Sequence, residues 1–176
     1  MSRATPIRTV LVVVSDRAAA GTRPDATAAL LRPVLAARGF ALDEVVVVPD
    51  ERAEIAAVLR ARVGAFGLLL TTGGTGVAPR DVTPEATRDV IEKEVPGLTE
   101  EIRRRSAERT VKALGSRAVA GTAGTSLVLN LPGRPEGAVE AFEFVAGVVP
   151  HLVDLLRGPV PDASHGGTGH GGGPVA

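Results

Sequence analysis

Residues 68–87 read LLLTTGGTGVAPRDVTPEAT, and this stretch decides the predicted fold of the chain. A short apolar run is followed by two threonines, three glycines within four residues, an Arg-Asp pair and Thr83-Pro84. Short continuous runs of Leu and Val are typical of strands buried on both faces of a parallel sheet. Proline is tolerated in the first turn of a helix, where its missing amide hydrogen has no partner to lose. The stretch therefore predicts a buried strand, a glycine-rich loop and the start of a helix capped by Thr83.

The rest of the chain repeats this alternation. Apolar runs predict three more buried strands over residues 9–14, 45–48 and 127–131, besides the one over 68–70. Helical periodicity lies between and after them, over residues 25–38, 51–63, 83–94, 98–111 and 135–156, with the last helix broken near Pro150. Strands that alternate with helices are connected by right-handed crossovers. We therefore expect an α/β three-layer sandwich with a mostly parallel central sheet.

Residues 117–131 differ from this pattern. Two β-like runs flank Gly-Thr-Ala-Gly, which predicts a hairpin or a tight return rather than a helix. From residue 158 the chain is rich in Gly and Pro and has little apolar content, which is typical of a disordered tail. We expect one domain over residues 1–157 and a disordered tail over residues 158–176.

The composition excludes several classes of function. The 20 basic residues balance the 20 acidic ones, so no overall field attracts nucleic acid or an anionic membrane. The absence of cysteine excludes disulfides and thiolate metal sites, and the three histidines have no partner at metal-ligand spacing. The apolar run before Ser15 has five residues, too few for a signal peptide or a membrane span. We expect a cytoplasmic protein that contacts neither nucleic acid nor membrane.

Polar residues follow every predicted strand. Ligands of open α/β sheets bind beyond the carboxyl ends of the strands, so these residues are candidates for one shared site. They are suited to an anionic, hydroxylated ligand, and they comprise Ser15, Asp16, Asp50, Thr72, Gly73, Gly74, Thr75, Gly76, Arg80, Asp81, Asn130, Pro132 and Gly133.

The glycine loop has two interpretations. Glycine leaves backbone N–H groups unshielded, so the loop can cradle phosphate oxygens, but glycine also serves a plain turn. The loop is not a Walker motif, because no Gly-Lys-Ser/Thr follows, and Pro79 stands where a dinucleotide fingerprint has its third glycine.

Asp50 and Asp81 are the candidate metal ligands. They follow different strands at one predicted edge of the sheet, where two carboxylates can hold the Mg²⁺ of a triphosphate. Each also has a structural interpretation: Asp50 as a cap for the next helix, and Asp81 as the partner of Arg80. Arg80 is itself suited to bidentate phosphate contact.

Four motifs together resemble the MogA/MoaB family of molybdenum-cofactor biosynthesis proteins. They are SDRAAAG (15–21), VVPDE (47–51), TTGGTGVAPRDVTPEAT (71–87) and LVLNLPGRPEGAVEAF (127–142). The resemblance covers about residues 7–157, and the Gly-Gly-Thr-Gly…Arg-Asp-x-Thr-Pro pattern is specific.

The resemblance implies a molybdopterin-binding α/β domain that assembles as a homotrimer and contacts a MoeA-type molybdate-inserting protein. It also implies adenylyl transfer from ATP to molybdopterin with Mg²⁺, in which Asp50 and Asp81 are the essential carboxylates. The glycine loop and the Leu-Pro-Gly segment would line the nucleotide and pterin site. Thr125 and Ser126 match the position at which family members bind the pterin phosphate, so we expect them at the same edge of the sheet as Asp50 and the glycine loop.

Two alternatives to catalysis stay open. Some MoaB-type members bind the pterin without catalysing, and the related MoeA and CinA domains suggest a scaffold. Many members have Asn or Ser after Leu-Pro-Gly, whereas this chain has Arg134. Retention of both aspartates favours the enzyme.

Overall fold

The computed structural model describes residues 5–22 and 25–158, so the predicted tail beyond Gly158 lies outside the described residues. One six-stranded sheet runs through the domain in the order β2-β1-β3-β6-β5-β4. The first four of these strands are parallel, and β5 pairs antiparallel with both β6 and β4. The strands are β1 (Ile7–Val14), β2 (Phe40–Val48), β3 (Leu68–Thr72), β4 (Lys93–Glu94), β5 (Ala120–Ala123) and β6 (Ser126–Leu131).

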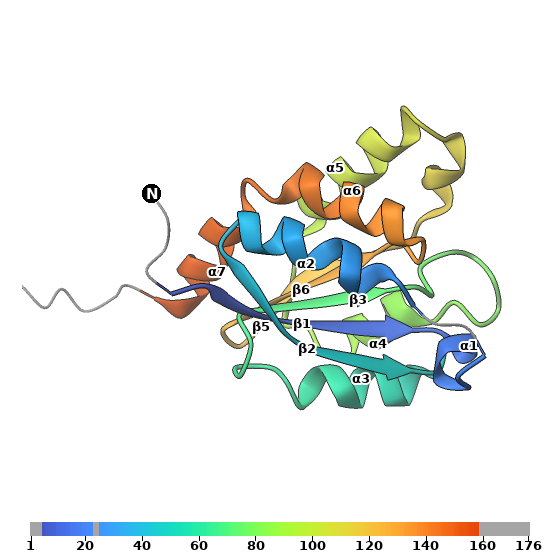
Figure 1. The fold of residues 1–176 in the computed structure, drawn as a ribbon, viewed down its shortest axis with the longest axis horizontal. Helices are drawn as coiled ribbons and strands as arrows, with labels where there is room; N and C mark the ends of the chain where they lie inside the picture. Colours follow the sequence, from blue (N-terminus) through green and yellow to red (C-terminus); the bar gives the residue numbers. More distant parts are fainter. Residues whose placement is uncertain (1–4, 23–24, 159–176) are drawn as a thin grey trace, which may run out of the picture.

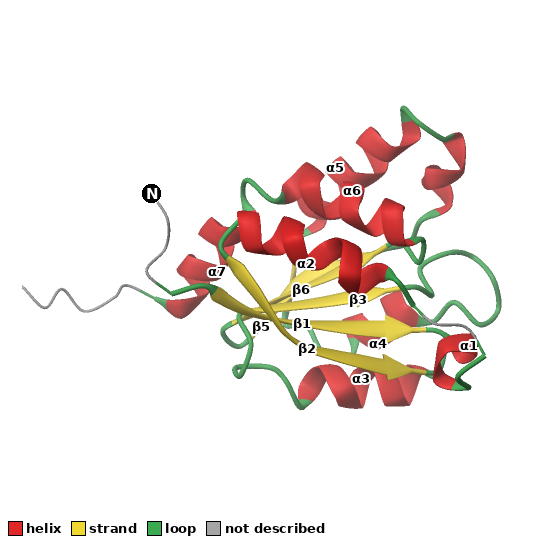
Figure 2. Ribbon diagram, in the orientation of Figure 1, coloured by secondary structure: helices red, strands yellow, loops and turns green. Residues whose placement is uncertain are grey.

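Helices cover both faces of the sheet, as Figure 2 shows. One face packs against α2, α5, α6 and α7, and the other packs against α3 and α4. The predicted three-layer α/β fold is confirmed. The helices are α1 (Asp16–Ala19), α2 (Thr27–Ala37), α3 (Arg52–Arg60), α4 (Thr83–Arg88), α5 (Pro96–Ala107), the 3₁₀ helix η1 (Val111–Gly115), α6 (Pro135–Val145) and α7 (Val149–Arg157).

Strand β1 shows why its sequence is apolar from Val10 to Val14. Leu11 and Val13 belong to the core under α2 and α6, whereas Val10 and Val12 belong to the core over α3. Successive side chains of a strand point to opposite faces, so a strand covered on both faces needs apolar residues at every position. Burial of this kind stabilises the sheet by about 1.5–3 kcal/mol for each large side chain.

Strand β2 corrects one prediction. It is longer than expected, and Val45 and Val47 are exposed, so it is not buried on both faces. The register places these valines beside Leu11 and Val13, but β2 is one of the two edge strands of the sheet. Apolar composition alone did not reveal this edge position.

Two predicted helices are shorter than expected. Helix α4 ends at Arg88, and Lys93–Glu94 form β4 by pairing with Thr122 and Gly121 of β5. Helix α5 ends at Ala107 and is followed by η1. The predicted cap also differs, because Val82 is the N-cap of α4 and the Thr83 hydroxyl donates to the Gly73 carbonyl at 2.8 Å.

Two other local predictions fare better. The hairpin is confirmed as β5–β6, although its turn lies at Gly124 and Thr125 rather than across Gly-Thr-Ala-Gly. The last helical region is broken between Val145 and Val149, just before Pro150.

Candidate active site

The carboxyl ends of four parallel strands meet at one edge of the sheet (Figure 1). Val14 at the end of β1 lies beside Val48 of β2, and Thr72 of β3 lies between Val13 and Leu131. The loops that follow these strands therefore share one crevice, as the topology predicts.

The loop after β3 approaches its neighbours backbone to backbone. Gly73 and Gly74 have φ of 97° and 64°, which side chains rarely adopt. A Cβ added to Gly73 would lie 2.2 Å from the Val14 carbonyl oxygen, and one added to Gly133 would lie 3.1 Å from the Gly73 Cα. The Thr72 hydroxyl donates to the Pro132 carbonyl at 2.7 Å. Glycine is required here for conformation as well as for access to the amides.

Asp50 and Asp81 both lie against this loop. A Cβ added to Gly74 would be 3.1 Å from Asp50 Oδ1, and one added to Gly76 would be 2.7 Å from Asp81 Oδ2. Neither structural interpretation of these carboxylates holds. Helix α3 has no side-chain cap, and Asp81 accepts from the Ala78 amide at 3.0 Å while Arg80 pairs elsewhere. Two carboxylates therefore lie against one glycine loop.

Asp16 holds Asp50 in a reciprocal arrangement. The Asp16 amide donates to Asp50 Oδ2 at 2.9 Å, and the Asp50 amide donates to Asp16 Oδ1 at 3.0 Å. Arg80 donates to both oxygens of Asp16, at 3.0 and 2.8 Å, and to Glu51 Oε1 at 2.9 Å. Asp16 and Arg80 were predicted to contact a ligand. In the structure they form an ion pair with each other beside Asp50.

These contacts separate the pKa values of the two neighbouring aspartates. The hydrogen bonds from Arg80, and then from the Asp50 amide, lower the pKa of Asp16. Burial raises the pKa of Asp50, and the charges of Asp16 and Asp81 act in the same direction. A carboxyl group whose pKa is raised in this way is stabilised in its charged form by a nearby cation.

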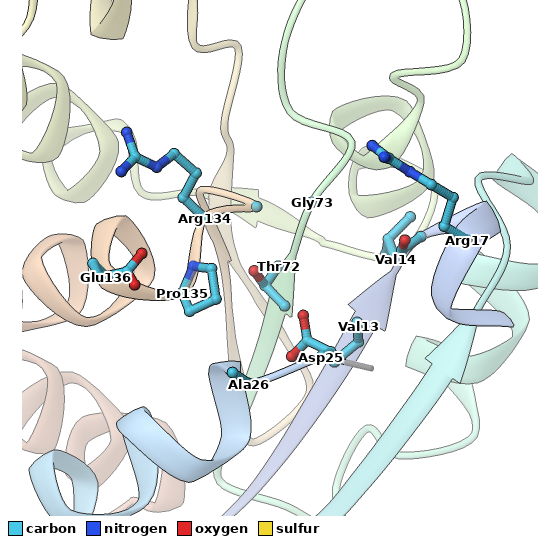
Figure 3. Close-up of a pocket in the computed structure, with 12 residues that line it drawn as sticks. Val13, Val14, Arg17, Asp25, Ala26, Thr72, Gly73, Arg134, Pro135 and Glu136 are labelled. Atoms are coloured by element: carbon cyan, nitrogen blue, oxygen red, sulfur yellow. The ribbon is translucent and has the colours of Figure 1, made fainter. Parts of the chain in front are cut away.

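A first cavity, the β1 cavity, has a volume of about 600 Å³ and lies beyond the ends of β1 and β3. Ser15, which accepts from the Ala18 amide at 3.2 Å, lines it together with Thr72, Gly73 and Gly133. Arg17 and Arg134 lie on opposite sides of Thr72 and Gly73 (Figure 3). Within the described part of the chain, neither guanidinium has a hydrogen bond or ion pair. Asp25 and Glu136 also line the cavity, so its acidic and basic residues balance, and the two unpaired guanidiniums are its groups for binding an anion.

A second cavity, the α5 cavity, has a volume of about 680 Å³. Thr75, Gly76 and Pro132 of the predicted set line it, with Ile102 and Val77 as apolar neighbours. It shares Gly133, Arg134 and Glu136 with the β1 cavity, so the two meet at the Leu-Pro-Gly segment. Its basic lining residues, which the sequence analysis did not single out as candidates, are Arg103, Arg109, Lys112 and Arg134.

Thr125 and Ser126 lie at the opposite end of β6. Strand β6 runs parallel to β3, with Leu127 beside Leu68 at their shared starting edge. The Ser126 hydroxyl is buried, donates to the Phe66 carbonyl at 2.6 Å and accepts from the Gly64 amide at 2.8 Å. The structure does not bring these two residues to the other candidates, and the expectation of a shared edge was wrong.

Asn130 is fully buried within the sheet rather than facing the crevice. Its Oδ1 accepts from the Val119 amide at 3.0 Å, and its Nδ2 donates to the hydroxyls of Thr71 and Thr87, each at 2.8 Å. The side chain ties β6 to β3, to α4 and to the segment before β5. The prediction of ligand contact is corrected to a structural role.

Replacing Asn130 with Ala is expected to lower the free energy of unfolding by about 2–4 kcal/mol, because three buried polar partners lose their bonds. Denaturant unfolding of the variant measures this loss. Replacing Thr125 with Ala serves as the control, because Thr125 is exposed in the β5–β6 turn. This change should alter the free energy of unfolding by less than about 0.5 kcal/mol. A loss of that small size for Asn130→Ala would show that the network is unimportant.

Comparison of the chain with known protein families identifies the family to which this site belongs. Residues 10–152 match the family described as "Probable molybdopterin binding domain". The chain belongs to this molybdopterin-binding family. The MogA/MoaB resemblance of the four motifs is thereby confirmed.

Relatives and solved structures of the molybdopterin-binding family resemble most of this chain. The molybdopterin adenylyltransferase of Escherichia coli K12 is 38% identical over 176 residues, covering 87% of each chain. The crystal structure of the molybdopterin biosynthesis enzyme MoaB from Thermus thermophilus has a TM-score of 0.81 and 46% identity, and covers 87% of this chain and 98% of that one.

Other relatives are longer proteins. The cinnamon protein of Drosophila melanogaster, a molybdenum cofactor synthesis protein, is 40% identical over 150 residues, which are 83% of this chain and 25% of that protein. The bifunctional molybdenum cofactor biosynthesis protein of Chlorobaculum tepidum is 36% identical over 152 residues, or 86% of this chain and 49% of that protein. The chain thus spans a quarter to half of these two relatives.

The donor set of the molybdopterin-binding domain fits magnesium better than a transition metal. In residues 5–22 and 25–158, no group of three or more His, Asp or Glu side chains could hold a metal ion. Mg²⁺ is commonly held by one or two carboxylates, with waters and substrate phosphates as its remaining ligands. Asp50 and Asp81, whose carboxylates lie against Gly74 and Gly76, match that requirement.

Glu85, in the first turn of α4, supports the loop through an ion pair with Arg117. The hydrogen bond from Arg117 lowers the pKa of Glu85 below its ordinary value of 4.5. A carboxyl group whose pKa is lower in the folded state than in the unfolded state stabilises the fold at pH values above its unfolded-state pKa. This stabilisation is lost as the pH falls through the folded-state pKa.

We therefore expect Glu85→Gln to lower stability at pH 7 by an amount that shrinks as the pH falls below 4.5. Unfolding curves of both proteins from pH 7 to pH 3 measure the difference. A difference that stays constant over this range would contradict the ion pair as its cause.

None of the helices in the described residues has the length and hydropathy of a membrane span.

Proposed function

We propose that this chain is a molybdopterin adenylyltransferase, which transfers AMP from ATP to molybdopterin and releases pyrophosphate. The observation that carries the proposal is the placement of the Asp50 and Asp81 carboxylates against Gly74 and Gly76 of one glycine loop. Relatives named molybdopterin adenylyltransferase in Escherichia coli K12 and Helicobacter pylori J99 support it, since each is 38% identical over more than four fifths of both chains.

The two cavities are suited to two substrates. The α5 cavity combines apolar Ile102 and Val77 with several cations, which suits a pterin that carries a phosphate. The β1 cavity, with Thr72, Gly73 and Arg17, suits the nucleotide. Because the cavities share Gly133 and Arg134, substrates bound in each would have their phosphates meet at that segment.

The reaction forms one P–O bond and breaks another. A phosphate oxygen of molybdopterin attacks the α-phosphorus of ATP, and the bond from that phosphorus to the β-bridging oxygen breaks, so pyrophosphate leaves with the electron pair. The attacking phosphate is already an anion and needs little help from a base, so catalysis depends on positioning and charge neutralisation.

The residues of this chain supply that positioning. Asp50 and Asp81 would hold the Mg²⁺, which neutralises the charge of the triphosphate when bound. The amides of the glycine loop would donate to phosphate oxygens, as backbone N–H groups do in anion-binding loops. Arg134, exposed and lining both cavities, would bind the phosphates where they meet.

The proposal is tested by mixing the protein with Mg²⁺, molybdopterin and ATP labelled at the α-phosphate. We expect label in the pterin and one pyrophosphate for each molecule adenylylated. Pterin binding with no transfer of label would favour the non-catalytic MoaB-type alternative. Capture of other cofactor proteins without nucleotide affinity would favour a scaffold related to the MoeA and CinA domains.

The proposal also includes a cytoplasmic homotrimer that passes its product to a MoeA-type molybdate-inserting protein. These features stay predictions from the family resemblance. Light scattering of the purified protein tests the trimer, and a binding assay with the molybdate-inserting partner tests the contact.

A further inference from the structure

We propose that Arg117 is the positioning residue for Asp81, and that it fixes the loop on which Mg²⁺-nucleotide binding depends. The inference rests on the proposed function for its role in catalysis. Arg117 was not among the candidates predicted from the sequence. The inference rests on the contacts of its side chain with the segment from Thr75 to Asp81.

The segment between Gly76 and Asp81 has almost no apolar anchor. Val77 is 78% exposed, and Ala78, Pro79 and Arg80 are exposed as well. A loop without buried side chains is held by its polar bonds and otherwise belongs to the least stable part of a fold. The position of Asp81 therefore depends on the hydrogen bonds of this segment.

Arg117 supplies bonds at both ends of the segment. Its Nε donates to the Gly76 carbonyl at 2.6 Å, and its Nη2 donates to the Asp81 carbonyl at 2.7 Å. Its own amide donates to the Thr75 carbonyl at 2.8 Å. One half-buried guanidinium thus clamps the two residues whose positions define the loop.

Local bonds carry this position to the Asp81 carboxylate. The Asp81 amide donates to the Ala78 carbonyl at 2.9 Å, and Asp81 Oδ2 accepts from the Ala78 amide at 3.0 Å. These bonds close a small turn, so fixing the Asp81 backbone also fixes its carboxylate. Glu85 pairs with Nη1 of Arg117 and orients the planar group.

Lysine cannot replace this arrangement. The guanidinium is planar and donates in several fixed directions, whereas an ammonium is a compact point charge on a flexible stem. Arg117→Lys keeps the positive charge beside Glu85 but cannot reach three acceptors in the same geometry. The variant therefore separates charge from positioning.

The test compares Arg117→Lys with wild type and with Arg32→Lys. Arg32 donates to the Leu42 carbonyl at 2.6 Å between α2 and β2, away from the crevice, so its variant also loses an arginine-to-carbonyl bond. We expect Arg117→Lys to weaken Mg²⁺-ATP binding about tenfold and to lower kcat by about 10²-fold, because displacing a positioned group by about 1 Å has effects of that size. Molybdopterin binding should weaken as well, because Gly76, whose carbonyl Arg117 bonds, lines the α5 cavity. Arg32→Lys should bind both substrates as wild type does.

Amide hydrogen exchange of residues 76–82 provides a readout that needs no turnover. Exchange there should accelerate in Arg117→Lys and stay at the wild-type rate in Arg32→Lys. Arg117→Gln replaces the lysine variant if the latter does not fold, because glutamine is also unable to bridge the two carbonyls.

The outcomes distinguish the two proposals. If wild type transfers no adenylyl group, the proposed function fails, while Mg²⁺-ATP binding and exchange still test Arg117. If Arg117→Lys binds Mg²⁺-ATP as wild type does and its loop exchanges at the wild-type rate, the assignment of Arg117 is overturned. A loss of Mg²⁺-ATP binding of the same size in Arg32→Lys would also overturn it, because it indicates general destabilisation.

Discussion

Asp81→Asn is expected to lower the rate of adenylyl transfer by about 10²-fold or more, while binding of molybdopterin stays near the wild-type level. The substitution keeps the size of the side chain and an oxygen that can accept from the Ala78 amide at 3.0 Å, but removes its negative charge. The charge is needed to hold Mg²⁺, so the loss should fall on turnover. The measurement is pyrophosphate release under saturating ATP and Mg²⁺.

Asp50→Asn should have an effect of the same order, since Asp50 lies against the same loop as Asp81. Asp43→Asn is the control, because Asp43 pairs with exposed Arg8 and has no place in the crevice. Turnover close to wild type in both the Asp50 and Asp81 variants would rule out a catalytic pair. Equal loss in the Asp43 variant would point to a fault of the assay.

Gly73→Ala is expected to reduce the free energy of unfolding by about 3 kcal/mol and to abolish nucleotide binding. Alanine is strained at the φ of 97° that Gly73 adopts, and its Cβ would lie 2.2 Å from the Val14 carbonyl oxygen. Either β1 or the loop has to move, and both border the β1 cavity. Denaturant unfolding and nucleotide titration measure the two effects.

Gly97→Ala is the matched control for this prediction. Gly97 lies in the first turn of α5, and a Cβ added there would meet no atom within 4 Å. Alanine favours a helix over glycine by about 1 kcal/mol, so this variant should be as stable as wild type or more so. A Gly73→Ala protein as stable as Gly97→Ala would mean that the close approach of β1 and the loop is not required.

The fold was predictable where one physical pattern dominated. The apolar run of β1 is buried on both faces, so its composition left little alternative to an inner parallel strand. Strand β2 was the exception, because its valines look the same in sequence whether a helix covers them or not. Strand β4 has two residues, Lys93 and Glu94, and forms only by pairing with β5, so no local sequence pattern predicts it.

The candidate site was predictable where residues follow strand ends directly. Asp50 and the glycine loop were placed correctly because parallel strands end at one edge. Thr125 was misplaced because it precedes its strand, so the same rule puts it at the far edge. Arg117 acts through side-chain bonds to carbonyls that are 36 and 41 residues away in sequence. Contacts of that range are set by tertiary packing, and no spacing in the chain reveals them.

The most direct test of the central claim is a crystal structure of this protein with Mg²⁺ and a non-hydrolysable ATP analogue. The account predicts a metal ion coordinated by the carboxylates of Asp50 and Asp81, with the phosphates against the amides of Gly73 to Gly76. A nucleotide bound away from this loop, or a metal that contacts neither aspartate, would contradict it.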